Sequence, residues 1–217
     1  MRLNAFFPSL DIGTDPMKIR DWAQAAEDLG YAYIEVPDHV FGAKARDGWT
    51  ALYNEKDAFH ETFVALGFLA AVTERIRLSS GILIAPQRQT GLIAKQAAEV
   101  DILSGGRLRL GIGLGWNHVE YEALDAEWKT RGARQAEQVE VLRRLWSQDL
   151  VSFTGRFSQS PGREHCPAAR AASDSDLVWR FVGCRPHACG PARRWMDADH
   201  DARRAGRARA WAFARTA

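Results

Sequence analysis

Apolar and polar positions alternate along the first 157 residues in blocks that predict strands and helices in turn. Short apolar runs predict strands, and stretches whose apolar residues recur every three or four positions predict helices. The runs that predict strands are Leu3–Phe7, Tyr31–Val36, Ile76–Ile84 and Leu108–Leu114. Strands that alternate with helices are typical of βα units around a parallel sheet, so the sequence predicts an α/β fold.

Four apolar stripes at helical spacing predict helices over roughly 16–29, 63–72, 90–103 and 133–146. The first helix has the clearest signals, with Asp15 as N-cap, Pro16 at the first helical position and Gly30 at its end. Thr90 is a candidate cap for the third helix. Residues 40–60 lack periodicity and predict a long loop, which in α/β enzymes often covers a site.

The composition changes near Phe157, shortly after a strand-like run at Val151–Phe153. Residues 1–157 contain 18 Lys+Arg and 21 Asp+Glu, whereas residues 158–217 contain 11 Arg, no Lys and 6 acids. GC-rich DNA read out of frame yields such Arg- and Ala-rich sequence. When Ser173–His200 is back-translated, the neighbouring frame can encode a strand followed by two glycines. We therefore interpret residues 1–157 as one domain and residues 158–217 as an out-of-frame, disordered tail.

The charge pattern argues against several classes of protein. The net charge of +2 favours neither a nucleic acid nor a membrane as partner. A basic extension that binds nucleic acid is an alternative interpretation of the tail, but the tail lacks regularly interleaved aromatic residues. No run resembles a signal peptide or a membrane span, so we expect a cytoplasmic protein. The three cysteines, all in the tail, match no zinc or disulfide spacing.

Four segments carry a resemblance to a known family. They are Leu29–Val40, Leu69–Arg88, Ala94–Arg107 and the run Leu110-Gly111-Ile112-Gly113-Leu114-Gly115-Trp116-Asn117 with the following Glu120–Leu124. These segments resemble the luciferase-like monooxygenase superfamily, and the similarity extends over residues 1–157. The Asp-His-Val sequence at 38–40 and the Gly-Trp-Asn run at 115–117 are similar to the branch that uses the deazaflavin coenzyme F420. Related branches use reduced FMN.

The resemblance implies the first half of an eight-stranded (β/α)8 TIM barrel, with four strands and the start of a fifth. It implies an oxidoreductase that transfers hydride to or from coenzyme F420 and acts on a small-molecule substrate. An FMN-dependent monooxygenase is one alternative, and a homodimer is a possible assembly. A second alternative is a truncated product without activity, because so few strands would leave bare edges and an uncovered apolar face.

The candidate site residues lie where the predicted strands end, as in other parallel barrels. The resemblance implies that His39, beside Asp38, donates a hydrogen bond or proton near the reactive carbon of the cofactor ring. An imidazole can exchange a proton near neutral pH. The alternative from position alone is that Asp38 caps the loop and His39 only packs.

Two further segments complete the candidate cofactor site. The resemblance implies a non-prolyl cis peptide at Gly81–Ile82, after Ser80, that bulges against the ring. The loop that borders the cofactor side chain would contain Gly113, Leu114, Gly115, Trp116 and Asn117. Glycines at alternate positions would let backbone N–H groups approach phosphate or ribityl oxygens. Asn117 is the expected side-chain hydrogen bonder, and Trp116 would stack or cap the barrel.

Other polar residues have simpler interpretations. Glu61 precedes an apolar helix and is expected to interact with the helix dipole. Arg88 and Lys95 could steer an anionic cofactor tail, but we expect surface charges. His60 and His118 lack partners at metal-ligand spacing and are expected in solvated loops, so no metal site is predicted.

Overall fold

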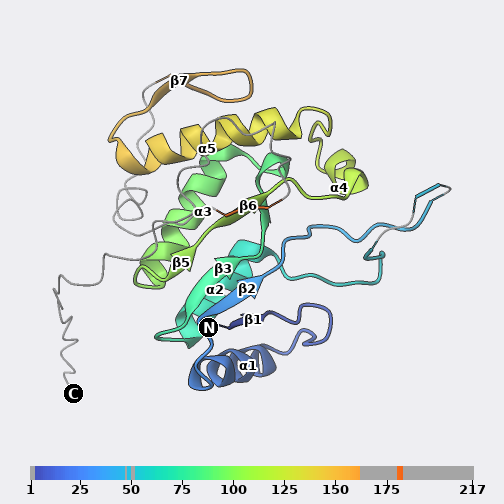
Figure 1. Cartoon of the computed structure of the whole chain (residues 1–217), viewed down its shortest axis with the longest axis vertical. Coiled ribbons are helices and arrows are strands. Elements are labelled where there is room, and N and C mark those ends of the chain that lie inside the picture. The colour runs from blue at the N-terminus through green and yellow to red at the C-terminus, as the bar shows by residue number, and fades with distance from the viewer. Residues whose placement is uncertain (1–2, 47, 50–51, 162–179, 183–217) are drawn as a thin grey trace. The chain divides into compact units, whose positions relative to one another are not determined.

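Helices and parallel strands alternate in the computed structural model, which describes residues 3–46, 48–49, 52–161 and 180–182 (Figure 1). The elements in chain order are β1 Asn4–Phe6, α1 Pro16–Asp28, β2 Tyr33–Val36, α2 Thr62–Val72, β3 Arg77–Ser80, β4 Leu83–Ile84, the 3-10 helix η1 Ala85–Gln87, α3 Thr90–Leu103, β5 Leu108–Arg109, β6 Gly111–Gly113, α4 His118–Ala123, α5 Arg131–Ser147, β7 Ser152–Thr154, β8 Gln159–Pro161 and β9 Arg180–Val182. The predicted α/β fold is confirmed.

Seven of the described strands form two parallel sheets whose members follow the order of the chain. One sheet has the order β1-β2-β3-β5, and the other has the order β4-β6-β9. The predicted strand Ile76–Ile84 is divided into β3 and β4, and the predicted strand Leu108–Leu114 is divided into β5 and β6. The carboxyl ends of these parallel strands therefore point the same way, towards the right in Figure 1.

One face of the first sheet packs against the helices and forms the core. Alternate strand residues, among them Ile34, Leu78 and Leu108, are fully buried with helix residues such as Leu66 and Ala97. The burial follows the two-residue period of a strand, so only every second side chain reaches the helices.

The opposite face of this sheet is mostly polar. Its residues are Asn4, Phe6, Tyr33, Glu35, Arg77, Ser79 and Arg109, and Phe6 is its exposed apolar member. Asn4 Nδ2 donates to Glu35 Oε1 at 2.9 Å, and Arg77 Nη1 donates to the Tyr33 hydroxyl at 2.8 Å. The expectation of an uncovered apolar face is therefore wrong, because strand alternation places polar side chains there.

From the sequence we expected the strand-like run at Val151–Phe153 to begin a fifth barrel strand, but it does not. The observed β7 pairs antiparallel with β8, and Glu137 of α5 accepts the backbone N–H groups of Arg156 and Phe157 in the connecting turn. It is β9 that pairs in parallel with β6. The hairpin continues past the compositional boundary at Phe157, and the remaining tail residues, 162–179 and 183–217, lie outside the described residues.

Most of the expected helix signals are confirmed. The Asp15 side chain accepts from Met17 N, and Pro16 is the first residue of α1. The Thr90 prediction is wrong: Gln89 is the N-cap residue of α3, and the Thr90 hydroxyl lies 3.3 Å from that of Ser158. The short helix α4 was not predicted. None of the described helices combines the length and apolar character that crossing a membrane requires.

Gly111 is required where β6 passes the end of β3. A Cβ atom at this position would lie 2.4 Å from the backbone oxygen of Ser80. We expect Gly111→Ala to lower the free energy of unfolding by about 1–3 kcal/mol, because backbone must move to make room. Gly67→Ala is the control, since a Cβ at that helical position meets nothing within 4 Å and alanine favours helix. Urea unfolding measures both, and equal stability of the two variants would contradict this assignment.

Candidate functional site

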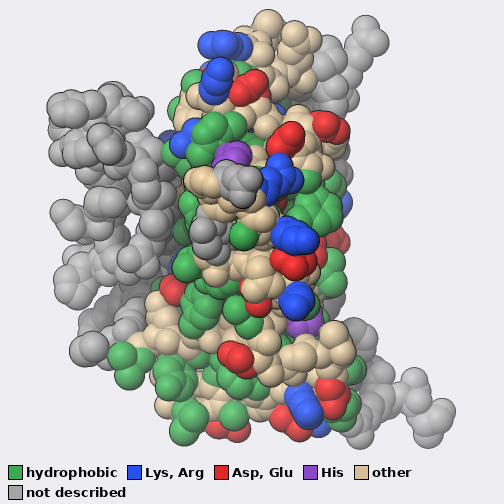
Figure 2. All heavy atoms as spheres, turned by 90° about the vertical axis from the view of Figure 1, so that its right-hand side faces the viewer, with side chains coloured by type: hydrophobic (Ala, Val, Ile, Leu, Met, Phe, Trp, Pro, Cys, Tyr) green, Lys and Arg blue, Asp and Glu red, His purple; other side chains and the backbone are tan. Residues whose placement is uncertain are grey.

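The predicted site residues gather at the carboxyl ends of the parallel strands. Asp38 and His39 follow β2, residues 80–82 connect β3 to β4, and residues 113–117 lead from β6 into α4. The expected cis peptide between Gly81 and Ile82 is present. Figure 2 shows the face towards which the strands point, where hydrophobic side chains are exposed among acidic and basic ones.

His39 is paired with a buried carboxylate that we did not predict as a site residue. Its Nδ1 lies 3.2 Å from Oε2 of Glu120, whose side chain is fully buried. The other oxygen, Oε1, accepts the backbone N–H groups of Val40 and Phe41 at 2.5 and 3.1 Å. Glu120 therefore orients His39 and holds the start of the loop that follows it.

The surroundings of Glu120 favour its ionised form. Burial raises the pKa of this carboxyl group, but the hydrogen bonds from His39 and from the backbone of Val40 and Phe41 outweigh burial, so the pKa is lowered from its ordinary value of 4.5. A carboxylate can only accept, so Nδ1 of His39 carries its hydrogen towards Glu120. A neutral His39 then presents the lone pair of Nε2.

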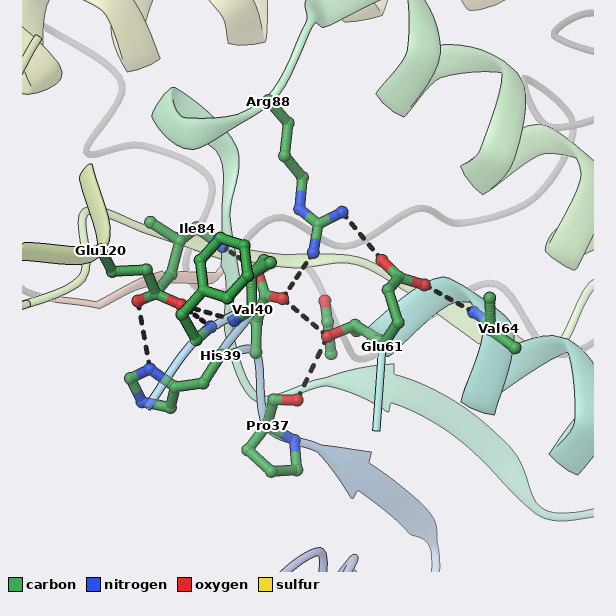
Figure 3. A network of polar contacts seen from close by, with 12 residues as sticks. Pro37, His39, Val40, Glu61, Val64, Ile84, Arg88 and Glu120 are labelled. Atoms are coloured by element: carbon green, nitrogen blue, oxygen red, sulfur yellow. Dashed lines mark hydrogen bonds and ion pairs between the residues drawn. The ribbon is translucent and has the colours of Figure 1, made fainter. Parts of the chain in front are cut away.

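Asp38 is enclosed by protein donors and belongs to the polar network of Arg88 and Glu61 that Figure 3 shows. Its Oδ1 accepts from the Thr62 hydroxyl at 2.8 Å and from Arg88 Nη2 at 2.6 Å, and its Oδ2 accepts from Ile84 N at 2.7 Å. The side chain is 1% exposed. We therefore assign Asp38 a positioning role in place of the direct cofactor contact expected, because both of its oxygens are already bonded.

Arg88 is the cation of this network and is not the surface charge that we expected. Its side chain is 14% exposed and bridges Asp38 and Glu61, with Nη1 lying 2.8 Å from Glu61 Oε1. Burial lowers the pKa of the Arg88 guanidinium, but Asp38 and Glu61 outweigh burial and raise it. Glu61 also caps α2 by accepting from Val64 N, as its expected interaction with the helix end requires.

The glycine run lets neighbouring strands pack closely, and its predicted phosphate contact stays a prediction. The Ser80 hydroxyl donates to the carbonyl of Gly111 at 2.8 Å. A Cβ on Gly113 would lie 2.5 Å from Ile82 Cδ1, and one on Gly115 would lie 2.9 Å from Ile84 Cδ1. The neighbouring strand therefore occupies the space that absent side chains leave, so Ser80 and these glycines hold two strands together.

Asn117 and Leu114 serve the fold of α4. Asn117 is the N-cap residue, and its Oδ1 accepts from Val119 N and Glu120 N at 3.2 and 3.3 Å. The Tyr121 hydroxyl donates to the Leu114 carbonyl at 2.7 Å. This cap fixes the position of Glu120, and the expected hydrogen bond from the Asn117 side chain to the cofactor stays a prediction.

Aromatic side chains surround His39. The ring centroids of Phe59, Tyr53 and Trp116 lie 4.8, 5.2 and 5.7 Å from the imidazole centroid. Trp49 lies almost parallel to Trp116, with centroids 6.4 Å apart. The described residues Trp49, Tyr53 and Phe59 of the predicted loop therefore lie over the end of β2, as the position of this loop in the sequence predicted.

A family model described as luciferase-like monooxygenase matches residues 3–178 of the chain. The chain belongs to this family. It is 34% identical over 153 residues to an uncharacterized protein of Mycobacterium bovis, a match that covers 67% of this chain and 53% of the relative. It is 33% identical over 141 residues to an FMNH2-dependent dimethylsulfone monooxygenase of Pseudomonas putida, covering 64% and 36% respectively. The match thus spans about half the length of the first relative and about a third of the length of the second.

Solved structures of similar fold include users of both cofactors. An F420-dependent tetrahydromethanopterin reductase from Methanopyrus kandleri aligns with a TM-score of 0.64 at 20% identity, over 83% of this chain and 49% of that one. The oxygenating constituent of 3,6-diketocamphane monooxygenase from Pseudomonas putida, in complex with FMN, aligns with a TM-score of 0.68 at 14% identity, over 84% and 52%. The chain therefore has the fold of about half of a TIM barrel.

Two important residues of this luciferase-like site were missed or underrated from the sequence. Glu120 has a detectable signal, because it lies three residues after Asn117 in the pattern of a helix cap followed by an acid. Arg88 has no local signal. His60 contacts the Gly13 carbonyl and His118 begins α4, and within the described part of the chain no group of His, Cys, Asp or Glu could hold a metal ion.

Proposed function

We propose that the chain is an oxidoreductase subunit or segment that uses coenzyme F420 for hydride transfer, with His39 as the catalytic residue. The observation that carries the proposal is the pairing of His39 with buried Glu120 at the carboxyl end of a parallel strand. Chemistry in parallel barrels takes place at this end of the strands. FMN is the alternative cofactor, since relatives of both kinds exist.

The described residues suit the ring of such a cofactor better than its phosphate. His39 offers Nε2, Trp116 is 37% exposed next to the imidazole, and Ile82 follows the cis peptide in the connection between β3 and β4. A Cβ on either glycine of β6 would meet Ser80 or Ile82, and the phosphate contact by the backbone N–H groups stays a prediction. By the family resemblance, some FMN-using members have an arginine where Leu114 stands, and the leucine weakens the case for a contact to the FMN phosphate.

The chain's own residues would handle the proton that accompanies hydride transfer. A bound deazaflavin or flavin supplies or accepts the hydride. Nε2 of His39 accepts a proton from a substrate hydroxyl group, or returns it in the reverse direction. Ionised Glu120 stabilises the imidazolium that forms, and Asp38 holds the end of β2 through Arg88 and Ile84.

Titration of the purified chain with coenzyme F420, followed by the cofactor's own fluorescence, tests this proposal. We expect saturable binding that is tighter than binding of FMN, and hydride transfer from a secondary alcohol panel in the loaded protein. Binding of FMN alone would favour the monooxygenase alternative. Binding of neither would support the alternative of a product without activity.

We also propose that the chain after Phe157 is read out of frame relative to its longer relatives, although the match to the family model continues to residue 178. The support is the change in composition there and the 53% coverage of a relative's length. Sequencing the encoding DNA and its transcript tests the idea. An absence of any open continuation in a neighbouring frame would refute it.

A further inference from the structure

We propose that the polar face of the first sheet docks against the same face of a second copy of this chain. The face consists of Asn4, Phe6, Tyr33, Glu35, Arg77, Ser79 and Arg109. The inference concerns assembly and does not depend on the proposed function. It follows from the topology of the sheet, from the position of the charges on its face and from the length of the chain.

An all-parallel sheet normally has both of its faces covered, because the connections between its strands place other elements against them. The strands β1, β2, β3 and β5 pair only in parallel, and helices pack on the face that carries Ile34, Leu78 and Leu108. On the polar face the side chain of Phe6 is 57% exposed. This end of the face is therefore accessible to a partner, and the topology favours one.

The charges of the polar face are separated from one another. The carboxylate of Glu35 lies on β2, and the guanidinium groups of Arg77 and Arg109 belong to β3 and β5. Glu35 pairs in register with Ser79, which pairs in register with Arg109. Neighbouring strands lie about 4.7–4.9 Å apart, so the acid stands in one half of the face and both bases stand in the other.

A two-fold axis parallel to the strands and midway between β2 and β3 brings opposite charges together. Rotation about this axis keeps the direction of the strands and reverses their order, so β2 lies opposite β3 of the partner subunit. Glu35 then faces Arg77 and Arg109 of the partner subunit, and Phe6 on β1 faces Arg109 of the partner subunit. Each contact occurs twice in such an isologous pair, and a guanidinium group binds favourably to an aromatic face.

The length of the chain favours a second copy as the occupant of this face. The match to the mycobacterial relative covers 53% of that protein, and the fold is about half of a TIM barrel. Two copies would therefore supply two such halves. The chain's own tail suits the face less well, because residues 158–217 contain 11 Arg and 6 acids and the face already has two arginines and one acid.

Sedimentation velocity of the full chain over a range of protein concentrations tests the inference. We expect a reversible equilibrium between monomer and dimer with a dissociation constant on the order of micromolar, because the interface is small and polar. Raising NaCl from about 0.05 M to about 0.5 M should increase this constant at least about fivefold, since salt screens ion pairs that are not deeply buried.

Charge-reversed variants locate the interface on the polar face. Glu35→Arg should weaken self-association at least about tenfold, because like charges then meet across the two-fold axis. The double variant Arg77→Glu, Arg109→Glu should do the same. An equimolar mixture of these two proteins should form a dimer at least as tight as that of the parent chain. Glu140→Arg, which reverses an exposed acid on α5, is the control and should leave the dissociation constant unchanged.

A chain that stays monomeric up to about 0.2 mM, well above the expected dissociation constant, would overturn the inference and favour the tail as the occupant. A dimer that Glu35→Arg leaves intact would also overturn it. If the charge-reversed variants unfold at a lower temperature than the parent chain, Phe6→Ala decides, because it should weaken the dimer about threefold without changing a charge. Titration with F420 tests the proposed function separately. A monomer that binds F420 would refute the docking alone, and a dimer that binds neither F420 nor FMN would refute the proposed function alone.

Discussion

Replacing Glu120 by Gln lowers the rate of hydride transfer by about 10²–10⁴-fold, the range for loss of a positioned acid–base group. The amide has one accepting oxygen, whereas the carboxylate serves His39 on one oxygen and two backbone N–H groups on the other. The variant therefore loses the charge that stabilises the imidazolium, and either His39 or the loop loses its acceptor.

A double-mutant comparison separates this positioning role from a general loss of structure. His39→Asn should lower the rate as much as Glu120→Gln, and the double variant should be no slower than His39→Asn alone, because Glu120 acts through His39. Imidazole ¹⁵N NMR gives a readout without turnover: neutral His39 should carry hydrogen on Nδ1 in the parent chain and shift towards Nε2–H in Glu120→Gln. Additive rate losses with an unchanged tautomer would contradict the assignment.

The pH dependence of stability follows from the same carboxylate. Because the folded chain lowers the pKa of Glu120 below its ordinary value of 4.5, ionisation of this group stabilises the fold above that value. The contribution is lost as the pH falls from about 4.5 through the lower folded pKa. Urea unfolding from pH 7 to 3 should therefore show a shallower acid decline in Glu120→Gln than in the parent chain.

The second large effect is expected for Asp38→Asn, which removes a buried charge from an ion pair. Arg88 keeps its contact to Glu61 but loses the carboxylate charge of Asp38, and the new amide nitrogen must face either the Ile84 N–H or the donors of Thr62 and Arg88. Breaking one side of a buried pair costs about 3–5 kcal/mol. Such a loss corresponds to a decrease in Tm of roughly 10 °C for a chain of this size.

Glu61→Gln is the matched control for this substitution. Glu61 contacts the same guanidinium, but its side chain is 35% exposed, so its loss should cost under about 1 kcal/mol. Thermal unfolding followed by circular dichroism measures both variants. Equal changes in Tm would show that the buried Asp38–Arg88 pair stabilises the fold no more than the more exposed Glu61–Arg88 pair does.

The fold was largely predictable because local signals and tertiary packing agree along the first 157 residues. The parallel strand runs and the four long helices were located within a few residues, with clear caps such as Asp15. The division of two strands was not predictable, since apolar runs such as Ile76–Ile84 continue through the break. The hairpin at β7 was misassigned because a three-residue strand looks the same whether its partner is parallel or antiparallel.

The position of the site was predicted from the sequence, but the hydrogen bonds and ion pairs within it were not. His39 and the cis peptide at Gly81–Ile82 lie where the resemblance implied. Other polar residues of the site have partners that we did not predict. A buried polar group must form hydrogen bonds, and the nearest partners here are protein atoms. Asp38 bonds Arg88 across 50 residues, and His39 bonds Glu120 across 81. Such separations leave no periodic trace in the sequence.

The polar face of the first sheet has a consequence for recombination between relatives. The hydrogen bonds Asn4–Glu35 and Tyr33–Arg77 already join neighbouring strands across that face. In a chimera, the second half of another barrel would face these fixed hydrogen-bond donors and acceptors. An apolar face would accept many different apolar side chains, whereas a polar face requires matching polar groups. The two halves of a barrel are therefore compatible only when their polar side chains can form hydrogen bonds with one another.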